Sequence, residues 1–233
     1  MYHHVWPGVA DSLTITPEQL EEQFVYLQSN GYRTISVSSL VESIYSNHPI
    51  PEKTIVLTFD DGYSNQINHV RPLLEKFGFC ACLFLIGEKV MTATGQVNGI
   101  KESYLSVENI CKADPDYFEF GLHGYSHHAL DNMANEDFRK DIILNQQVFS
   151  AMNISVVPVF AYPYGSRSSD KEKRRLAKKI MQECGIKAAF RIGNGSVSLP
   201  VKDPYELKRI DITGFDNIKR FRIKLEKGKL KPF

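Results

Sequence analysis

Short apolar runs alternate with helix-like patterns along most of this chain, and this alternation limits the possible folds most strongly. Strands buried on both faces read as continuous apolar runs and occur in parallel sheets covered by helices. The pattern predicts strands at residues 2–5, 34–37, 54–59, 79–86, 118–122, 156–161, 187–190 and 207–212 and, among its helices, 17–30, 39–45, 68–77, 136–152 and 171–184. So many strand–helix units favour an α/β barrel of parallel strands over an open sheet.

The composition is that of an ordinary globular protein, with 42% hydrophobic and 24% charged residues. A formal net charge of +1 gives no electrostatic reason to expect nucleic acid as a partner. No apolar run approaches the ~20 residues of a membrane span. Residues Met1–Val5 also lack the basic and apolar regions of a signal peptide. We therefore expect a cytoplasmic protein, or a sequence that begins after a removed segment.

The four cysteines, Cys80, Cys82, Cys111 and Cys184, form no Cys-x-x-Cys pair. Cys80 and Cys82 lie on the same face of a predicted strand, where small apolar side chains suit a core. We expect reduced, structural thiols and a reducing compartment.

Two adjacent carboxylates, Asp60 and Asp61, directly follow the strand predicted at 54–59. Alone, Asp-Asp-Gly is more often a turn or a helix cap. Two neighbouring carboxylates are costly to ionise together unless a metal or a proton separates their roles. Downstream, His123 and His127 follow the strand predicted at 118–122. One carboxylate and two histidines form a common open metal site, and the second carboxylate is then left as a base, as in a hydrolase.

All of these polar residues, and also Tyr164, follow predicted strands. In a parallel barrel the C-terminal ends of the strands meet at one face, which holds the active site. The strand pattern alone therefore predicts that these side chains converge at the C-terminal face of the barrel.

Three segments resemble, in the expected order, motifs of the polysaccharide deacetylases of the NodB-homology type, carbohydrate esterase family 4. Thr58–Gly62 resembles the first motif, His123 and His127 resemble the metal-binding pair, and Ala161–Gly165 resembles one wall of the active-site groove. The resemblance implies a distorted barrel of about seven parallel strands. It covers roughly residues 1–215, taken as the catalytic barrel, with 216–233 as a basic C-terminal extension of the same domain.

The resemblance also implies roles for these residues. Asp60 would be the general base, and Asp61 would bind a metal together with the two histidines. The backbone N–H of Tyr164 would stabilise an oxyanion. Zinc is the default ion for mixed histidine and carboxylate ligands, while nickel and cobalt remain open.

The chain departs from the family pattern at two positions beside these motifs. Ala161 stands where the family often has an arginine that orients the base, and Arg209 on the late strand is the candidate replacement. Gly124 stands where serine or threonine is common after the first histidine; that hydroxyl is peripheral, so the metal site is expected to remain.

The motifs do not identify the general acid. Many family members supply a histidine near the C-terminal end, and this sequence has no histidine after His128. Some relatives that deacetylate exopolysaccharides instead carry Tyr-His on the opening strand, which Tyr2–His3 resembles. Strand alternation lets only one of His3 and His4 enter the barrel mouth, and we assign that place to His3. A disordered terminus is the alternative.

A few further residues and one segment allow more than one interpretation. Trp6 either stacks on a sugar ring or belongs to the core. His128 is interpreted as a surface or outer-layer residue, and His48 and His69 as surface or packing residues. The segment 92–104 is long enough to suggest a lid.

The resemblance implies a metal-dependent hydrolase that removes the N-acetyl group from an amino sugar in a glycan or glycan precursor. Its partner would be an N-acetylated sugar or oligosaccharide in surface-polysaccharide biosynthesis. Two alternatives stay open, namely hydrolysis of a non-peptide C–N bond in a small cyclic amide, and a catalytically degenerate glycan-binding protein. Ala161 and the uncertain acid favour the binder, whereas the intact aspartate and histidine pairs oppose it.

Overall fold

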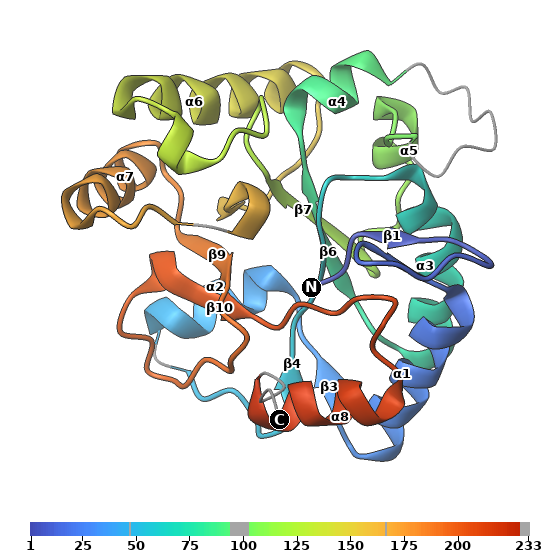
Figure 1. The fold of residues 1–233 in the computed structure, drawn as a ribbon. Coiled ribbons are helices and arrows are strands. Elements are labelled where there is room, and N and C mark those ends of the chain that lie inside the picture. Colours follow the sequence, from blue (N-terminus) through green and yellow to red (C-terminus); the bar gives the residue numbers. More distant parts are fainter. Residues whose placement is uncertain (47, 94–102, 166, 229–233) are drawn as a thin grey trace.

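A parallel sheet forms the centre of the computed structural model, which describes residues 1–46, 48–93, 103–165 and 167–228 (Figure 1). In this part of the chain the sheet has six strands in the order β10-β9-β8-β7-β6-β5. They are β5 (Leu57–Phe59), β6 (Ala81–Leu85), β7 (Phe118–Leu122), β8 (Val159–Ala161), β9 (Ala188–Ile192) and β10 (Leu207–Arg209). Since all neighbours are parallel, their C-terminal ends lie at one edge, as expected.

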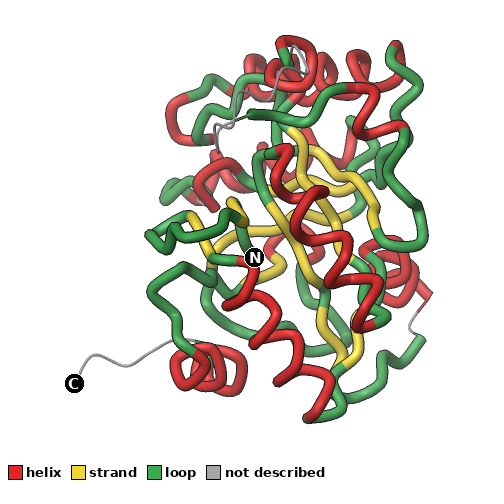
Figure 2. The backbone as a smooth tube through the Cα atoms, turned by 90° about the vertical axis from the view of Figure 1, so that its right-hand side faces the viewer, coloured by secondary structure: helices red, strands yellow, loops and turns green. Residues whose placement is uncertain are grey.

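Helices surround this sheet, as Figure 2 shows for the helices in red around the strands in yellow. The longer ones are α1 (Pro17–Ser29), α3 (Ser64–Phe77), α6 (Asn135–Ala151) and α7 (Lys171–Glu183). The shorter ones are α2 (Val37–Ser46), α4 (Gly87–Thr92), α5 (Val107–Cys111), α8 (Ile218–Lys227) and the 3₁₀ turns η1 (Leu130–Asn132), η2 (Pro163–Gly165) and η3 (Pro204–Glu206). Sheet and helices together form the expected distorted barrel. At the seam between β5 and β10 the opening residues join the two edges, because Met1 bonds to Ile210 and Ile212 just after β10.

The described sheet has six strands where the resemblance implied about seven, and the opening segment accounts for the difference. The Tyr2 N–H donates to the Thr58 carbonyl at 2.9 Å, and the Asp60 N–H donates to the Tyr2 carbonyl at 2.9 Å. The chain then leaves the sheet, because β1 (His4–Val5) pairs with β2 (Thr14–Ile15) instead. Tyr2 therefore makes only an isolated bridge at the position of a seventh strand.

Two other predicted strands were partly wrong. The strand expected at 34–37 is β3 (Arg33–Thr34), and Val37 already begins α2. The strand expected at 54–59 is divided into β4 (Thr54–Ile55), which pairs with β3, and β5. The Glu119 carboxylate accepts the Val37 N–H at 2.7 Å, so a contact from the distant strand β7 stabilises the beginning of α2.

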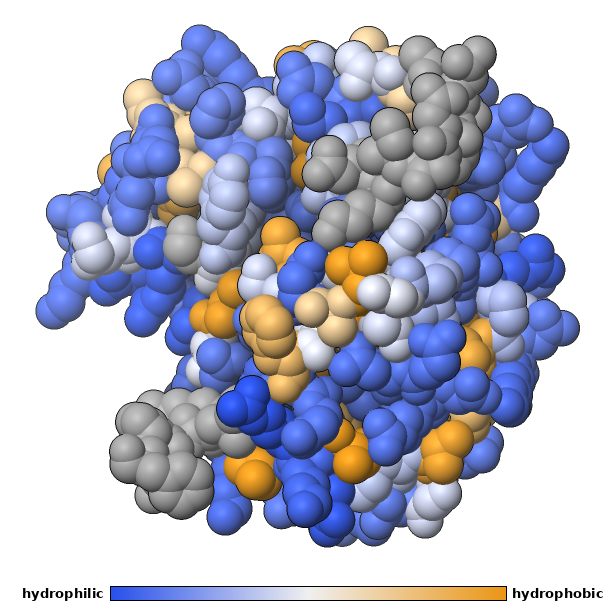
Figure 3. All heavy atoms as spheres, turned by 45° about the vertical axis from the view of Figure 1, so that its right-hand side comes forward, coloured by the Kyte–Doolittle hydropathy of each residue, from blue (hydrophilic) through white to orange (hydrophobic). Residues whose placement is uncertain are grey.

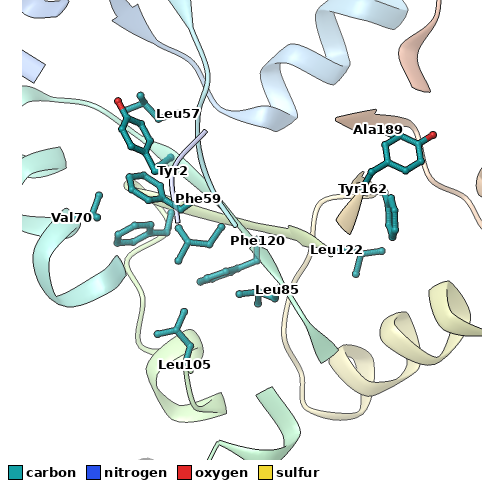
Figure 4. Packing of buried hydrophobic residues seen from close by; sticks show 14 of the residues in the cluster. Tyr2, Leu57, Phe59, Val70, Leu85, Leu105, Phe120, Leu122, Tyr162 and Ala189 are labelled. Carbon is teal, nitrogen blue, oxygen red and sulfur yellow. The ribbon is translucent and has the colours of Figure 1, made fainter. Parts of the chain in front are cut away.

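The core has two parts that face the two sides of the sheet. The larger part lies between the sheet and the helices, and Figure 4 shows some of its side chains, including Tyr2, Phe59 and Phe120. The smaller part fills the barrel with Cys82, Phe84 and Phe190, among others, and the partly buried apolar residues of α2 pack against it. All four cysteines are free thiols, as predicted.

The predicted C-terminal extension contains α8, which packs on the body of the protein. Phe221 is buried in the larger core, and Arg222 lies over the Tyr26 ring of α1 at 5.4 Å. Residues 229–233 of this extension lie outside the described residues. Among the helices that the structure describes, none is long and apolar enough to cross a membrane. Figure 3 shows a mostly hydrophilic face with hydrophobic residues in small groups.

Candidate active site

The predicted site residues lie where the strands of the sheet end. Asp60 and Asp61 follow β5, His123 follows β7, and Tyr164 lies in η2 just after β8. Arg209 is the last residue of β10, at the opposite edge of the sheet. The barrel therefore brings together residues that are up to 149 positions apart in the sequence.

Asp61, His123 and His127 converge on one point. One ligand atom from each lies within 4.8 Å of those of the other two. Asp61 Oδ1 is 3.4 Å from His123 Nε2 and 3.3 Å from His127 Nε2. The two histidines do not lie on one helix turn, since a loop after β7 carries both. Their predicted juxtaposition is therefore produced by a tight loop.

The three side chains fit a divalent metal in two respects beyond their spacing. Asp61 Oδ1 is buried and makes no hydrogen bond within the described part of the chain. His123 Nδ1 lies 2.8 Å from the Ala161 carbonyl, which can only accept, so Nδ1 carries the proton and Nε2 presents its lone pair. This is the orientation that a partner behind a metal-ligating histidine usually enforces.

Backbone strain is concentrated at this site. Among the described residues, six non-glycine residues have positive φ, and Asp61 (74°), His127 (56°) and Tyr164 (58°) are three of them. A non-glycine residue in this region costs of order 1–3 kcal/mol and persists only where its surroundings enforce it. The same three residues are predicted site residues, as expected for strain stored at a functional site.

Asp60 lies beside the metal-ligand candidates and is held by Arg209. The guanidinium donates from Nη1 to Oδ1 at 2.6 Å and from Nη2 to Oδ2 at 2.7 Å. Both side chains are nearly inaccessible to solvent. Asp60 Oδ2 also lies 3.9 Å from His123 Nε2. Arg209 therefore occupies the place that we predicted for a replacement of the motif arginine absent at Ala161.

The charges of the site favour an added cation. Burial opposes the ionisation of Asp60, but Arg209 and His123 hold the pKa of its carboxyl below the usual value. Burial likewise opposes the ionisation of Asp61, but the two neighbouring histidines hold the pKa of its carboxyl far below the usual value. Burial would lower the pKa of His123, yet the two carboxylates raise it. The two carboxylates, Asp60 and Asp61, thus stabilise positive charge at the position where a metal would lie.

His3 and His4 face different surroundings, as strand alternation predicted. His4 is buried, stacks on Tyr63 with ring centroids 3.6 Å apart, and bonds to Asn65 through Nδ1 at 3.0 Å. His3 is half-buried; burial lowers the pKa of its imidazole, while the charges of Asp60 and Asp61 act in the opposite direction. His3 thus lies within the electrostatic influence of both site carboxylates.

Tyr164 forms one wall of the site. Its ring is exposed and lies 4.8 Å from the His127 ring. The next residue, Gly165, has φ of 60°, and a Cβ there would lie 2.0 Å from Ile192 Cγ1. Only glycine fits this close approach, so Gly165 fixes the turn that carries Tyr164.

The sequence did not identify Asp141 on α6, which contacts the loop between the two histidines. Its Oδ2 accepts from the Tyr125 N–H at 2.8 Å, and its Oδ1 accepts from the Ser126 N–H at 2.8 Å. The sequence did contain an indication of this role, because Asp141 lies on the apolar stripe of α6 with Phe138 and Ile142. A charged residue on a buried stripe indicates a specific partner.

The remaining histidines and Trp6 take the following places. His128 is exposed, and its Nδ1 lies 2.7 Å from Ser126 Oγ, consistent with a surface or outer-layer position. Trp6 is half-buried and meets the His69 ring edge-on at 5.9 Å. His48 lies 2.9 Å from Ser46 Oγ on the surface. Most of the predicted lid, residues 94–102, lies outside the described residues.

The family model described as "Polysaccharide deacetylase" matches residues 47–189, more than half of the chain. The chain belongs to the polysaccharide deacetylase family. The matched segment includes the aspartate pair, the histidine pair and the Tyr164 turn, so the resemblance predicted from these motifs is confirmed.

Similar proteins support this assignment. The chain is 24% identical over 186 residues to the "Putative polysaccharide deacetylase YxkH" of Bacillus subtilis, covering 80% of this chain and 62% of that protein. It is 37% identical over 93 residues to the "Poly-beta-1,6-N-acetyl-D-glucosamine N-deacetylase" of Escherichia coli, covering 39% of this chain and 14% of that protein. The chain thus spans less than two thirds of either relative.

A solved structure shares the fold over nearly the whole chain. The Streptococcus pyogenes deacetylase PplD, described in complex with acetate, superposes with a TM-score of 0.80 at 17% identity. The superposition covers 99% of this chain and 96% of that one. The barrel predicted from the strand–helix alternation, which the family resemblance implied to be distorted, is therefore a fold that this chain shares with a solved deacetylase.

Proposed function

We propose that this protein is a metal-dependent hydrolase that removes the N-acetyl group from an amino sugar in a glycan or glycan precursor. The observation that carries the proposal is a buried carboxylate, Asp60, held by Arg209 beside the converging Asp61, His123 and His127. Such a site separates a base from a metal triad, which a hydrolase needs and a pure binding site does not.

Asp61, His123 and His127 would hold the metal, and zinc suits a set of two imidazoles and one carboxylate best. Nickel and cobalt accept the same ligands. A bound divalent ion supplies a Lewis acid that acidifies water and polarises a carbonyl.

The remaining residues would carry the proton transfers of amide hydrolysis. Asp60, kept ionised by Arg209, takes a proton from the water that attacks the acetyl carbon. The Tyr164 backbone N–H donates to the oxygen on which negative charge develops. His3 gives a proton to the departing nitrogen as the C–N bond breaks. The products are acetate and a free amine.

An N-acetylated polysaccharide is the proposed substrate class. The relatives named above include a deacetylase of poly-β-1,6-N-acetyl-D-glucosamine. The test is acetate release by the zinc-loaded protein from oligomers of N-acetylglucosamine, measured with an enzymatic acetate assay. Release of acetate with equal formation of free amine supports the proposal. Opening of a small cyclic amide without acetate release from any oligomer would instead identify the alternative hydrolase.

Replacing His3 with alanine is expected to lower the rate of acetate release by about 10²-fold, since water is a poorer proton donor to the departing nitrogen. Zinc content should stay at the wild-type value, because His3 is not among the proposed ligands. The measurement is kcat at saturating oligomer beside zinc content. The matched control is His69→Ala, a histidine that contacts Trp6 and not the carboxylates. Equal kcat for wild type and His3→Ala would remove His3 from the proposed mechanism.

A further inference from the structure

The loop that carries the histidine pair, residues 123–127, has a strained backbone conformation that needs contacts from other elements. Gly124 and His127 both have positive φ, at 78° and 56°, and the loop turns sharply between the two predicted ligands. Such a conformation is strained at a non-glycine residue such as His127 and needs outside contacts to persist. Among the other elements of the fold, α6 provides contacts of this kind to the loop.

Asp141 makes three contacts with this loop. Besides the backbone N–H groups of Tyr125 and Ser126, it accepts the Ser126 hydroxyl at 2.6 Å. Asp141 is 9% exposed, and α6 places it directly behind the loop. Hydrogen bonds to a carboxylate are about twice as strong as neutral ones, and partial burial strengthens them.

The contact with Asp141 also explains the glycine after the first histidine. A Cβ built on Gly124 would lie 2.7 Å from Asp141 Oδ2, so a serine or threonine there would displace the carboxylate. The loop hydroxyl that Asp141 accepts belongs to Ser126, two residues later. Since Ser126 Oγ donates its proton to Asp141, it accepts from His128 Nδ1 at 2.7 Å. Ser126 thus links Asp141 to the histidine loop.

We infer that Asp141 is a positioning residue that holds the 123–127 loop so that His127 reaches Asp61 and His123. The inference rests on the proposed metal site, because its effect is on the assembly of that site. Asp141 touches none of the three proposed ligand side chains directly; it acts through the backbone of Tyr125 and Ser126.

The test is zinc affinity of the full chain, measured by competition with a chromophoric chelator. Asp141→Asn places an amide N–H against one of the loop donors, the N–H groups of Tyr125 and Ser126. We expect zinc to bind about 10- to 100-fold more weakly, the loss typical for outer-layer partners of metal sites. Asp137→Asn, an exposed carboxylate one turn away on α6, is the matched control and should bind zinc like the wild type. Ser126→Ala removes one of the three contacts and should weaken binding by a smaller factor.

The melting temperature of the zinc-free proteins separates positioning from general stabilisation. A merely structural Asp141 would lower that temperature and leave zinc affinity within twofold of the wild type, and this result would overturn the inference. Should Asp141→Asn fail to fold, Ser126→Ala decides, and wild-type zinc affinity in that variant would overturn the inference equally. Absence of zinc binding in the wild type would contradict the proposed metal site itself, so the two failures are distinguishable.

Discussion

Asp60→Asn is expected to lower the rate of acetate release by up to about 10⁴-fold while zinc still binds. The amide cannot take a proton from water, and the variant removes the carboxylate that Arg209 holds in place. Zinc binding should persist because Asp61, His123 and His127 are unchanged. The measurement is kcat from an acetate assay, with zinc content determined on the same samples.

The control for this variant is Asp116→Asn, an exposed carboxylate that lies away from the site. It should release acetate at the wild-type rate. A rate for Asp60→Asn within about tenfold of the wild type would fall outside the range expected for loss of a general base and would rule out that role.

Arg209→Met is expected to lower the free energy of unfolding by about 3–5 kcal/mol, because it leaves the buried Asp60 carboxylate without its partner. Burial alone disfavours the ionised form of this carboxyl, and Arg209 is the strongest opposing influence on its pKa. Urea unfolding of wild type and variant at neutral pH measures the difference. Acetate release should fall as well, since the base loses its fixed orientation.

The double variant Asp60→Asn/Arg209→Met provides the internal control. A neutral amide leaves no unpaired charge, so the double variant should lose less stability than the sum of the two single variants. Arg175→Met, which breaks an exposed pair with Glu172, should change stability little. Additive losses in the double variant would show that the Asp60–Arg209 pair is not coupled.

The local pattern predicted most of the sheet, and its errors have long-range causes. The strand at 118–122 was predicted with the bounds that the structure has. The strand predicted at 34–37 ends early because Glu119, on a distant strand, accepts the N–H groups of Val37 and Ser38 and stabilises the beginning of α2. No window around residue 37 contains that contact.

In the candidate site, too, residues recognisable by local pattern were predicted and a residue that depends on a distant contact was missed. Asp61, His123 and His127 were predicted as a group because the proposed ligands have distinctive residue types that follow strands. Arg209 was predicted from its place on a late strand, and the structure places it on Asp60. Asp141 was missed because its role depends on α6 packing behind the histidine loop. The sequence showed it only as a charge on an apolar stripe.

The metal content of the purified protein, compared with that of His123→Ala/His127→Ala, tests the central claim most directly. Emission spectroscopy of metals after dialysis against zinc, followed by removal of loose ions, gives the stoichiometry. We expect about one zinc per chain in the wild type and none in the double variant, because one carboxylate alone is too weak a site. Wild-type protein without metal, or equal metal in both proteins, would contradict the metal-dependent mechanism.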